Sequence, residues 1–309
     1  MIRIGIIGTG EMAHIHIVGL LTSNQYEIAG CYAPENRQSM TFARKYRLIS
    51  YSSVEALFKY ADAIDIIDDL PETIQLAELS LKAMKHVFIV HPDRLNIKQM
   101  QYLKKLAEKS GVVLQLGTGY LYCPVYNKLG ETMQKAMLVD IRHQIVFNTI
   151  NLAALTNLVP AQMKMQLSYN LDFVTSILNA NIIKIDVKQW NQKENLPNAL
   201  HCRIVCDNGS MINLMVYTIA EGEPNTEVIF TSSDDIIRAI IFKSIIEKQS
   251  RTDNTVNKIK LEAFNEKIIH QQYLKNFYQA ICNEHDAIKK IEKLYQNIAA
   301  ADDILERVN

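Results

Sequence analysis

Short apolar runs alternate with longer amphipathic stretches along roughly the first 120 residues of the chain. This alternation is typical of a parallel sheet whose buried strands are joined by helices. The apolar runs predict strands at residues 2–7, 27–32, 63–67, 86–90 and 112–116. The stretches between them predict helices at residues 11–21, 36–46, 54–60, 72–83 and 97–109. The N-terminal part of the chain is therefore expected to be an α/β domain.

The pattern changes after Leu116, which indicates a domain boundary, and we place the two domains at residues 1–122 and 123–309. The second domain is predicted to hold a helix at 124–137 and a buried helix at 167–178, with two amphipathic helices at its end. Predicted strands are 138–147, 182–190, 199–206, 210–217 and 227–232. The pair Asn208-Gly209 indicates a hairpin, because both central positions of a type I′ turn need positive φ.

The composition excludes several classes of protein. The 309 residues are enough for about two domains. Lys and Arg number 33, as do Asp and Glu, so no net positive field favours nucleic acid. No apolar run approaches the roughly 20 residues that cross a bilayer, and the first residues have the pattern of a strand rather than a signal peptide. Five cysteines without paired CxxC spacings fit a reduced, cytoplasmic protein.

A glycine loop is the most informative segment. It follows the first predicted strand, opens the first predicted helix and reads Gly8, Thr9, Gly10, Glu11, Met12, Ala13. In such a GxGxxA loop the first glycine permits a tight turn and the second lets the backbone approach a pyrophosphate. The small third residue allows helix and strand to pack closely. The free N–H groups of the helix N-terminus attract phosphate, so these six residues are predicted to bind a dinucleotide.

With this loop, the sequence resembles the Gfo/Idh/MocA family of glucose-fructose oxidoreductases and inositol dehydrogenases over nearly its whole length. The matching stretches are residues 4–20 with His16, residues 76–87, Pro92 at the end of the family's Glu-Lys-Pro motif, and residues 273–280. The resemblance implies an α/β fold, with an N-terminal Rossmann domain and a C-terminal α/β domain on an open, mainly antiparallel sheet. That sheet often forms the interface of a homodimer or homotetramer.

The resemblance also implies site residues, and here the sequence departs from the family. Members usually oxidise a secondary alcohol with a lysine, an aspartate and a histidine. An ungapped registration on Asp172 puts His91, Met165 and Tyr169 at these three positions, and Tyr122 and Asp172 in the substrate pocket. His91 and Tyr169 are the catalytic candidates, because an imidazole titrates near neutrality and a phenol can donate a proton to an oxyanion. Alternatively, both side chains merely line a pocket that has lost its chemistry.

The expected cofactor is NAD or NADP. At the end of the second strand the acidic residue that would hold the adenosine ribose is replaced by Ala33, which removes the usual reason to prefer NAD. Arg37 is placed to meet a 2′-phosphate and favours NADP, whereas Glu35 argues against it. The sequence predicts no metal site. His14 and His16 point to different sides of a helix, and Asp68-Asp69 lacks a neighbouring third ligand.

Two functions remain open on the sequence. The first is an NAD(P)-dependent oxidoreductase acting on a small hydroxylated or carbonyl substrate with an altered proton-transfer group. The second is a relative without redox turnover that binds a nucleotide or metabolite, or serves as a structural partner. The glycine loop favours the first function, and the changed catalytic positions favour the second. Fold alone does not decide between them, because function depends on the site.

Overall fold

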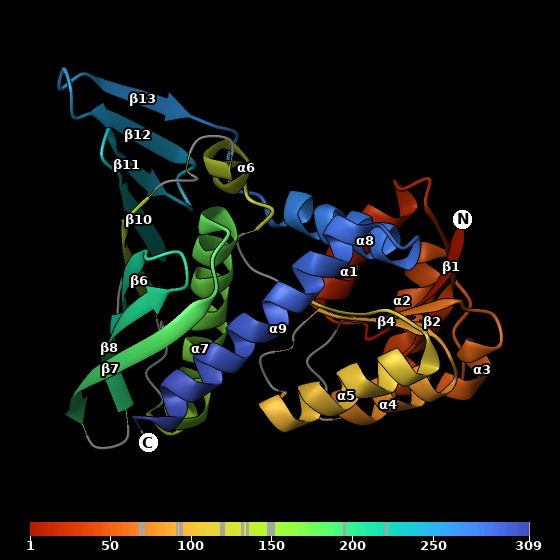
Figure 1. Ribbon diagram of the computed structural model, residues 1–309. Helices are drawn as coiled ribbons and strands as arrows, with labels where there is room; N and C mark the ends of the chain where they lie inside the picture. Colours follow the sequence, from red (N-terminus) through yellow and green to blue (C-terminus); the bar gives the residue numbers. More distant parts are fainter. Residues whose placement is uncertain are drawn as a thin grey trace. The chain divides into compact units, whose positions relative to one another are not determined.

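The computed structural model describes residues 1–67, 72–90, 92, 95–117, 121–130, 133, 136–146, 152–193, 196–219 and 222–308. The chain divides into two compact units (Figure 1). Unit 1 comprises Met1–Thr118 and Glu266–Tyr295, and unit 2 comprises Gly119–Asn265 and Gln296–Asn309. Among the described residues, no helix combines the length and apolar character needed to cross a membrane.

Unit 1 is built on a parallel sheet in the order β2-β1-β3-β4-β5. Its strands are β1 (Ile2–Ile7), β2 (Tyr26–Tyr32), β3 (Ala63–Ile66), β4 (His86–Ile89) and β5 (Leu114–Leu116). The connecting helices are α1 (Glu11–Leu21), α2 (Asn36–Tyr46), α3 (Val54–Phe58), α4 (Thr73–Lys82) and α5 (Ile97–Ser110). β3 and β5 are wholly buried and β1 and β4 mostly so, whereas the edge strand β2 is partly exposed; the Rossmann fold of this part of the chain is confirmed.

Unit 1 also contains a late segment of the chain. The sequence analysis assigned residues 266–295 to the second domain, but α8 (Glu266–Ile281) and the first part of α9 (His285–Glu306) belong to unit 1. The reason is the apolar face of α8, which packs against α1 and buries Leu274 and Phe277 in the core of unit 1. Gln115 on β5 reinforces this packing by donating to the carbonyl of Tyr273 at 3.0 Å.

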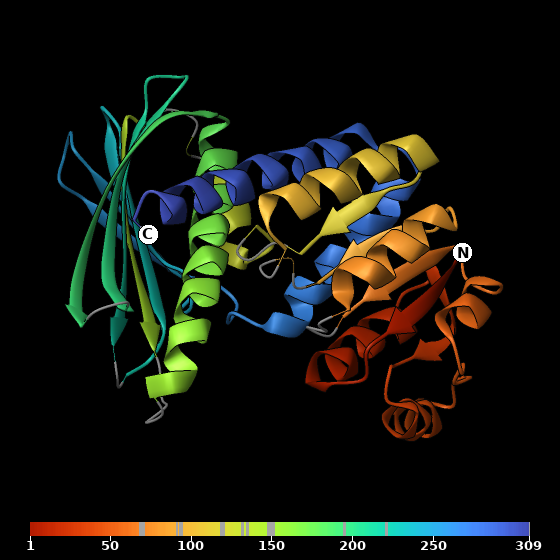
Figure 2. The same ribbon diagram turned by 90° about the horizontal axis from the view of Figure 1, so that it is seen from below.

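Unit 2 is built on a sheet in the order β13-β12-β11-β10-β6-β9-β8-β7, in which only the pair β6 and β9 is parallel among the described pairings. The strands are β6 (Leu138–Val146), β7 (Ile182–Lys193), β8 (Leu196–Cys206), β9 (Met211–Ile219), β10 (Asn225–Thr231), β11 (Asp235–Ile240), β12 (Ile245–Ser250) and β13 (Val256–Lys260). Helix α6 (Pro124–Gly130) precedes the sheet, and α7 (Leu152–Leu178) lies along one of its faces (Figure 2). The predicted mainly antiparallel sheet is confirmed.

Helix α7 begins well before the predicted start at residue 167. The predicted helix did not extend to earlier residues because Lys164 and Gln166 interrupt the apolar run. In the structure Lys164 is 7% exposed, and its Nζ lies 2.8 Å from Oδ1 of Asp302 on α9. A lysine on the buried side of this helix is tolerated because a carboxylate that is far away in the sequence lies beside it and balances its charge.

The hairpin between β8 and β9 differs from the predicted type I′ turn. Gly209 has positive φ, at 84°, but Asn208 does not. The N–H of Gly209 donates to the carbonyl of Cys206 at 3.0 Å, and the amide of Asn208 donates to the carbonyl of Leu178 at 3.2 Å. The side chain of Asn208 is thus used to attach the turn to the end of α7, which selects a turn with a single left-handed residue.

His143, on the buried face of β6, makes the stability of unit 2 sensitive to acid. The side chain is 2% exposed, its Nδ1 lies 2.7 Å from Oγ1 of Thr226, and burial lowers the pKa of the imidazole to about 3. Between that value and the ordinary pKa of 6.5, the unfolded chain binds a proton that the folded chain does not. The free energy of unfolding therefore falls as the pH is lowered through this range, by about 1.4 kcal/mol per pH unit.

Replacing His143 by glutamine is expected to remove this dependence. Between pH 6.5 and 5 the unmodified protein should lose about 2 kcal/mol more stability than His143→Gln, measured by urea unfolding at each pH. His201→Gln is the matched control, because His201 lies on β8 of the same sheet but is exposed. An unchanged slope in His143→Gln would show that His143 is not the acid-sensitive group.

Candidate functional site

The glycine loop forms the tight turn that the sequence predicted. Gly8 has φ 111°, which favours glycine, and its N–H donates to the carbonyl of Tyr32 at the end of β2. Gly10 is the N-cap of α1 and has extended backbone, with φ −73° and ψ −168°. Ala13 is fully buried, as the close packing of α1 on the sheet requires. None of the described side chains caps this N-terminus; the N–H of Ala13 donates to the carbonyl of Gly10 at 3.1 Å, and the helix dipole favours an anion at this end.

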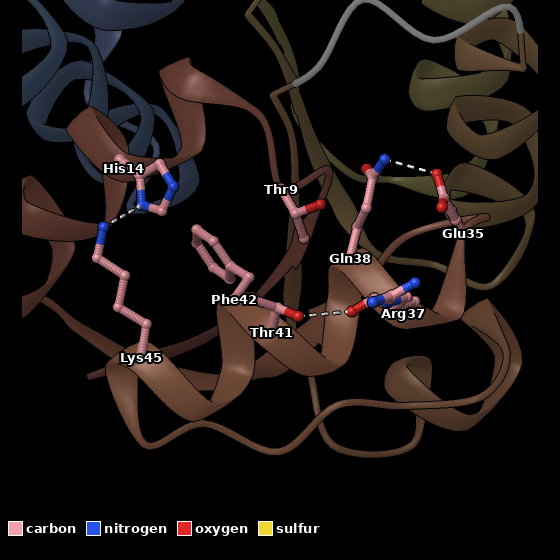
Figure 3. A pocket seen from close by; sticks show the side chains of 8 residues that line it. All are labelled: Thr9, His14, Glu35, Arg37, Gln38, Thr41, Phe42 and Lys45. Carbon is pink, nitrogen blue, oxygen red and sulfur yellow. Dashed lines mark hydrogen bonds between the residues drawn. The ribbon is translucent and has the colours of Figure 1, made fainter.

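A pocket of about 570 Å³ opens beside this loop (Figure 3). It lies between α1, α2 and the turn that leads into α2. The lining residues come from the glycine loop, from the residue directly before α2, from α1 and from one face of α2; they are Thr9, Glu35, His14, Arg37, Gln38, Thr41, Phe42 and Lys45. The position of the pocket, at the carboxyl ends of β1 and β2, is where a doubly wound sheet binds the adenosine half of a dinucleotide.

The pocket is more basic than the sequence prediction indicated. Arg37 and Lys45 are both exposed, whereas Glu35 accepts a hydrogen bond of 2.5 Å from Nε2 of Gln38. His14 is half-buried, and its Nδ1 lies 2.6 Å from the hydroxyl of Tyr46 and 3.4 Å from Nζ of Lys45. The sequence analysis found Arg37 but missed His14 and Lys45 as a pair. A helical wheel of α2 puts Lys45 on the face of Gln38 and Phe42, which was the signal available.

Ala33 leaves the end of β2 without the carboxylate that would accept hydrogen bonds from the ribose hydroxyls. Ala33 is 6% exposed, and Glu35 is the N-cap of α2, with no hydrogen bond from its side chain to a backbone N–H of the helix. The side chain of Glu35 lines the pocket and accepts a hydrogen bond from the side chain of Gln38 (Figure 3). Of the other predicted loop residues, Met12 is half-buried on α1 and nothing is described of the side chain of Glu11.

The proposed catalytic histidine, His91, lies outside the described residues, as do Asp68 and Asp69. The backbone that leads to His91 is described. The N–H of Val90 donates to Ile66 at 3.0 Å, which brings the chain to the carboxyl edge of the sheet. A Cβ on Gly117 would lie 2.1 Å from the carbonyl oxygen of Val90, so glycine is required where the chain leaves β5.

Tyr169 and Met165 share a half-buried stripe of α7 in unit 2. The spacing of four residues places both side chains on one side of the helix, as their registration with a catalytic pair requires. Lys164, Ser168 and Asp172 lie on the buried side instead. Since His91 belongs to unit 1 and Tyr169 to unit 2, the two catalytic candidates come from different units.

Asp172 is fully buried within unit 2. Its Oδ1 accepts a hydrogen bond of 2.9 Å from Nδ2 of Asn297, whose Oδ1 in turn accepts from Thr175. The pKa of the half-buried Tyr122 is raised, mainly by burial and further by the negative charge of Asp172. Asp172 thus connects α7 to α9 and does not face solvent.

A buried chain of three titratable side chains in unit 1 was missed by the sequence analysis. Nδ1 of His16 lies 2.9 Å from Oδ2 of Asp65, and Nε2 of His16 lies 2.7 Å from Nδ1 of His270. All three are at most 7% exposed. They connect α1, β3 and α8. His16, to which the resemblance gave no role, thus helps to hold α8 on the sheet. Among the described residues, no group of three or more His, Cys, Asp or Glu side chains could hold a metal ion.

Residues 2–118 match the family model described as the oxidoreductase family with NAD-binding Rossmann fold, GFO_IDH_MocA. The N-terminal part of the chain is therefore similar to the NAD-binding domain of the Gfo/Idh/MocA family. Two relatives with assigned activities are 26% identical to this chain. They are glucose-6-phosphate 3-dehydrogenase of Bacillus subtilis, over 42% of this chain, and UDP-N-acetylglucosamine 3-dehydrogenase of Acidithiobacillus ferrooxidans, over 37%. The matches span 37% and 36% of the lengths of these relatives, little more than a third.

Solved structures resemble the chain over nearly its whole length. A dehydrogenase from Clostridium difficile has a TM-score of 0.83 at 17% identity, covering 99% of both chains. Biliverdin reductase from Synechocystis, in complex with biliverdin and NADP+, has a TM-score of 0.78 at 14% identity, covering 99% of this chain and 98% of its own. GenD2 of gentamicin A biosynthesis, in complex with NAD, has a TM-score of 0.72 at 13% identity, covering 97% and 94%. At these identities the similarity shows a shared fold.

Proposed function

We propose that this protein is an NAD(P)-dependent oxidoreductase that interconverts a secondary alcohol and a ketone on a small hydroxylated substrate. The observation that carries the proposal is the glycine loop, which keeps its positive-φ glycine and uncapped helix N-terminus and opens onto a pocket of about 570 Å³. A relative that only kept the fold would not need this combination. The five cysteines fit a reducing compartment, and a cytoplasmic location is part of the proposal.

The bound nicotinamide would supply the hydride acceptor, and the chain would supply the proton acceptor. In the oxidation direction the hydroxyl proton of the substrate would pass to a base of this chain. We assign the base to His91 and the group that bonds the developing oxyanion to Tyr169. The activities named for the two relatives suggest a secondary hydroxyl of a sugar phosphate or nucleotide sugar as the first substrate class to test.

The experiment that tests this function is a calorimetric titration of the nucleotide-free protein with NADH and NADPH in parallel. Micromolar binding of either is expected, since the phosphate-binding loop is intact. Reduction of the bound NADP+ or NAD+ by glucose 6-phosphate or UDP-N-acetylglucosamine would then be followed at 340 nm. If neither cofactor binds at millimolar concentration, the protein is not a nicotinamide-dependent enzyme.

We further propose a preference for NADP, supported by Arg37 and by the missing carboxylate at Ala33. Arg37→Ala is expected to weaken NADPH binding about tenfold and to leave NADH binding unchanged, because only NADPH carries the 2′-phosphate. Calorimetry with both cofactors measures this. Arg44→Ala is the matched control, since Arg44 is exposed on α2 but does not line the pocket. Equal losses for the two cofactors would remove Arg37 from this role.

The outer face of the unit 2 sheet, opposite α7, is proposed to pair with a second copy of the chain in a homodimer or homotetramer. Trp190, Met211 and Met215 lie on this face and are 62%, 37% and 40% exposed. Large apolar side chains on a sheet face are typical of an interface. Sedimentation velocity should show an oligomer that Met215→Glu dissociates; a monomeric unmodified protein would contradict the proposal.

A further inference from the structure

A second pocket of unit 1 lies at the β5 edge of its sheet, whereas the glycine loop follows β1. It has a volume of about 200 Å³ and lies between α5 and the part of α9 that belongs to unit 1 (Figure 2). The turn that leads into β5 completes the lining. The two pockets share no lining residue among those described, and the proposed function gives this second pocket no role.

The inner part of this pocket is apolar. Ala107 on α5 and Leu114 on β5 are both buried, and Ile291 on α9 lines the pocket together with them. An engineered apolar cavity of about 150 Å³ is known to bind benzene, so this pocket has room for a branched aliphatic or phenyl group. It is too small for a dinucleotide, because pockets for drug-sized ligands and cofactors begin at about 300 Å³.

The ring of Tyr295 forms the wall on the side of α9. Its hydroxyl donates to the carbonyl of Leu114 at 3.2 Å, which fixes the ring against the edge of the sheet. Burial, and further the negative charge of Glu108, raise the pKa of the phenol, so the hydroxyl stays protonated and able to donate. Nζ of Lys104 lies 5.5 Å from the centroid of the same ring, within the range of a cation–π contact. The ring thus connects the apolar part of the pocket to charged groups.

These charged groups form a rim of both signs. Lys104 and Glu108 come from consecutive turns of α5, and Glu292 comes from α9. Nζ of Lys104 lies 3.8 Å from Oε1 of Glu108, and both side chains are well exposed, so their ion pair is weak and either group can take another partner. An apolar carboxylate would attract Lys104 but be repelled by the two glutamates, and an apolar amine would meet the opposite charges. A ligand that carries an ammonium and a carboxylate beside its apolar group matches the whole rim.

We infer that this pocket binds a free α-amino acid with an apolar side chain of about the size of leucine or phenylalanine. The apolar side chain occupies the inner part, the carboxylate pairs with Lys104, and the ammonium pairs with Glu108 and Glu292. The inference goes beyond the proposed function and does not rest on it, because no residue of the cofactor pocket takes part. The position suits an effector, since unit 1 ends at Tyr295 and α9 continues from Gln296 into unit 2.

The test is calorimetric titration of the full chain with L-leucine, L-phenylalanine and two analogues of leucine. Of the analogues, 4-methylpentanoate lacks the ammonium group and 3-methylbutylamine lacks the carboxylate, while both keep the isobutyl group. L-Leucine or L-phenylalanine is expected to bind at one site with a Kd below about 1 mM. Each analogue should bind about tenfold more weakly than leucine, because one charged contact is lost. Glycine should bind about a hundredfold more weakly, because it buries no apolar side chain.

Variants of the rim locate the site. Lys104→Gln and Glu292→Gln should each weaken the binding of leucine about five- to tenfold. Lys105→Gln is the matched control and should leave it unchanged, since Lys105 is the exposed neighbour on α5 that does not line the pocket. Circular dichroism shows whether each variant is folded, which is expected because the altered side chains lie at the surface.

Three results would overturn the inference. They are no binding of either amino acid at about 10 mM, an affinity for one of the two analogues that equals that for leucine, and unchanged affinity for leucine in both rim variants. None of these measurements involves a nicotinamide cofactor. Failure of this inference is therefore distinguishable from failure of the proposed function.

Discussion

Replacing Lys164 by methionine is expected to lower the free energy of unfolding by about 3 to 5 kcal/mol. The side chains of Lys164 and Asp302 are only 9% and 16% exposed, and they are joined by a contact of 2.8 Å between α7 and α9. Oδ2 of Asp302 is buried and has no partner among the described residues, so the lysine is the group that compensates this carboxylate. Removing Lys164 leaves the largely buried carboxylate of Asp302 without its positive partner.

A double-mutant cycle tests this interpretation by urea unfolding. Lys164→Met combined with Asp302→Leu should recover most of the lost stability, because an apolar pair of similar volume carries no unpaired charge. Lys248→Met is the control. Lys248 pairs with Asp235 at the same distance, but it is 44% exposed, and we expect a loss below about 1 kcal/mol. A similarly small loss in Lys164→Met would mean that solvent reaches Asp302.

Replacing His91 by alanine is expected to lower turnover by about 10² to 10⁴ while the affinity for the cofactor stays nearly the same. The expected loss is that of a general base, since the hydroxyl proton would have to leave without an acceptor at the carboxyl edge of the unit 1 sheet. The measurement is the rate of NADPH formation with the sugar substrate identified by the assay at 340 nm, together with a calorimetric titration of the variant.

Tyr169→Phe provides a second measurement, because it removes the phenol but keeps the half-buried ring on α7. We expect it to lower kcat with little change in KM, as for a group that bonds the oxyanion. His201→Ala, far in sequence and exposed on β8, controls for the loss of a histidine. Unchanged turnover in His91→Ala would remove His91 from the catalytic role and leave the proton acceptor to be found elsewhere.

The local sequence pattern was sufficient to predict helices and strands whose bounds depend on residues close together in the sequence. The bounds of β1, α1 and α2 agree with prediction to the residue, because the apolar period and the glycine loop define them within a few positions. Helix α5 has Asn96 as its N-cap, which forms a capping box with Gln99. Its C-cap is Gly111, which has the left-handed conformation. Such signals are readable in a single sequence.

Features that depend on distant residues were missed. The strands β11, β12 and β13 were not predicted because charged residues interrupt their apolar pattern, yet Arg238 pairs with Glu227 and Glu247, and Lys258 with Glu247, across neighbouring strands. The contact between Lys45 and His14 was missed for the same reason, as were the hydrogen bonds that connect Asp65, His16 and His270. In each case only the fold brings the residues together. Long-range pairing of charges leaves no periodic trace in the sequence.

The composition of unit 1 from two separated segments has a consequence for synthesis on the ribosome. The Rossmann strands leave the exit tunnel first, but the segment that supplies His270, Leu274 and Phe277 follows only after nearly all of unit 2 has been translated. At about 5 to 20 residues per second, the apolar surface that α8 covers stays open for roughly ten seconds or longer. Unit 1 is thus completed only after nearly all of unit 2 has been translated, and a nascent chain of this protein is expected to bind chaperones that shield apolar surface.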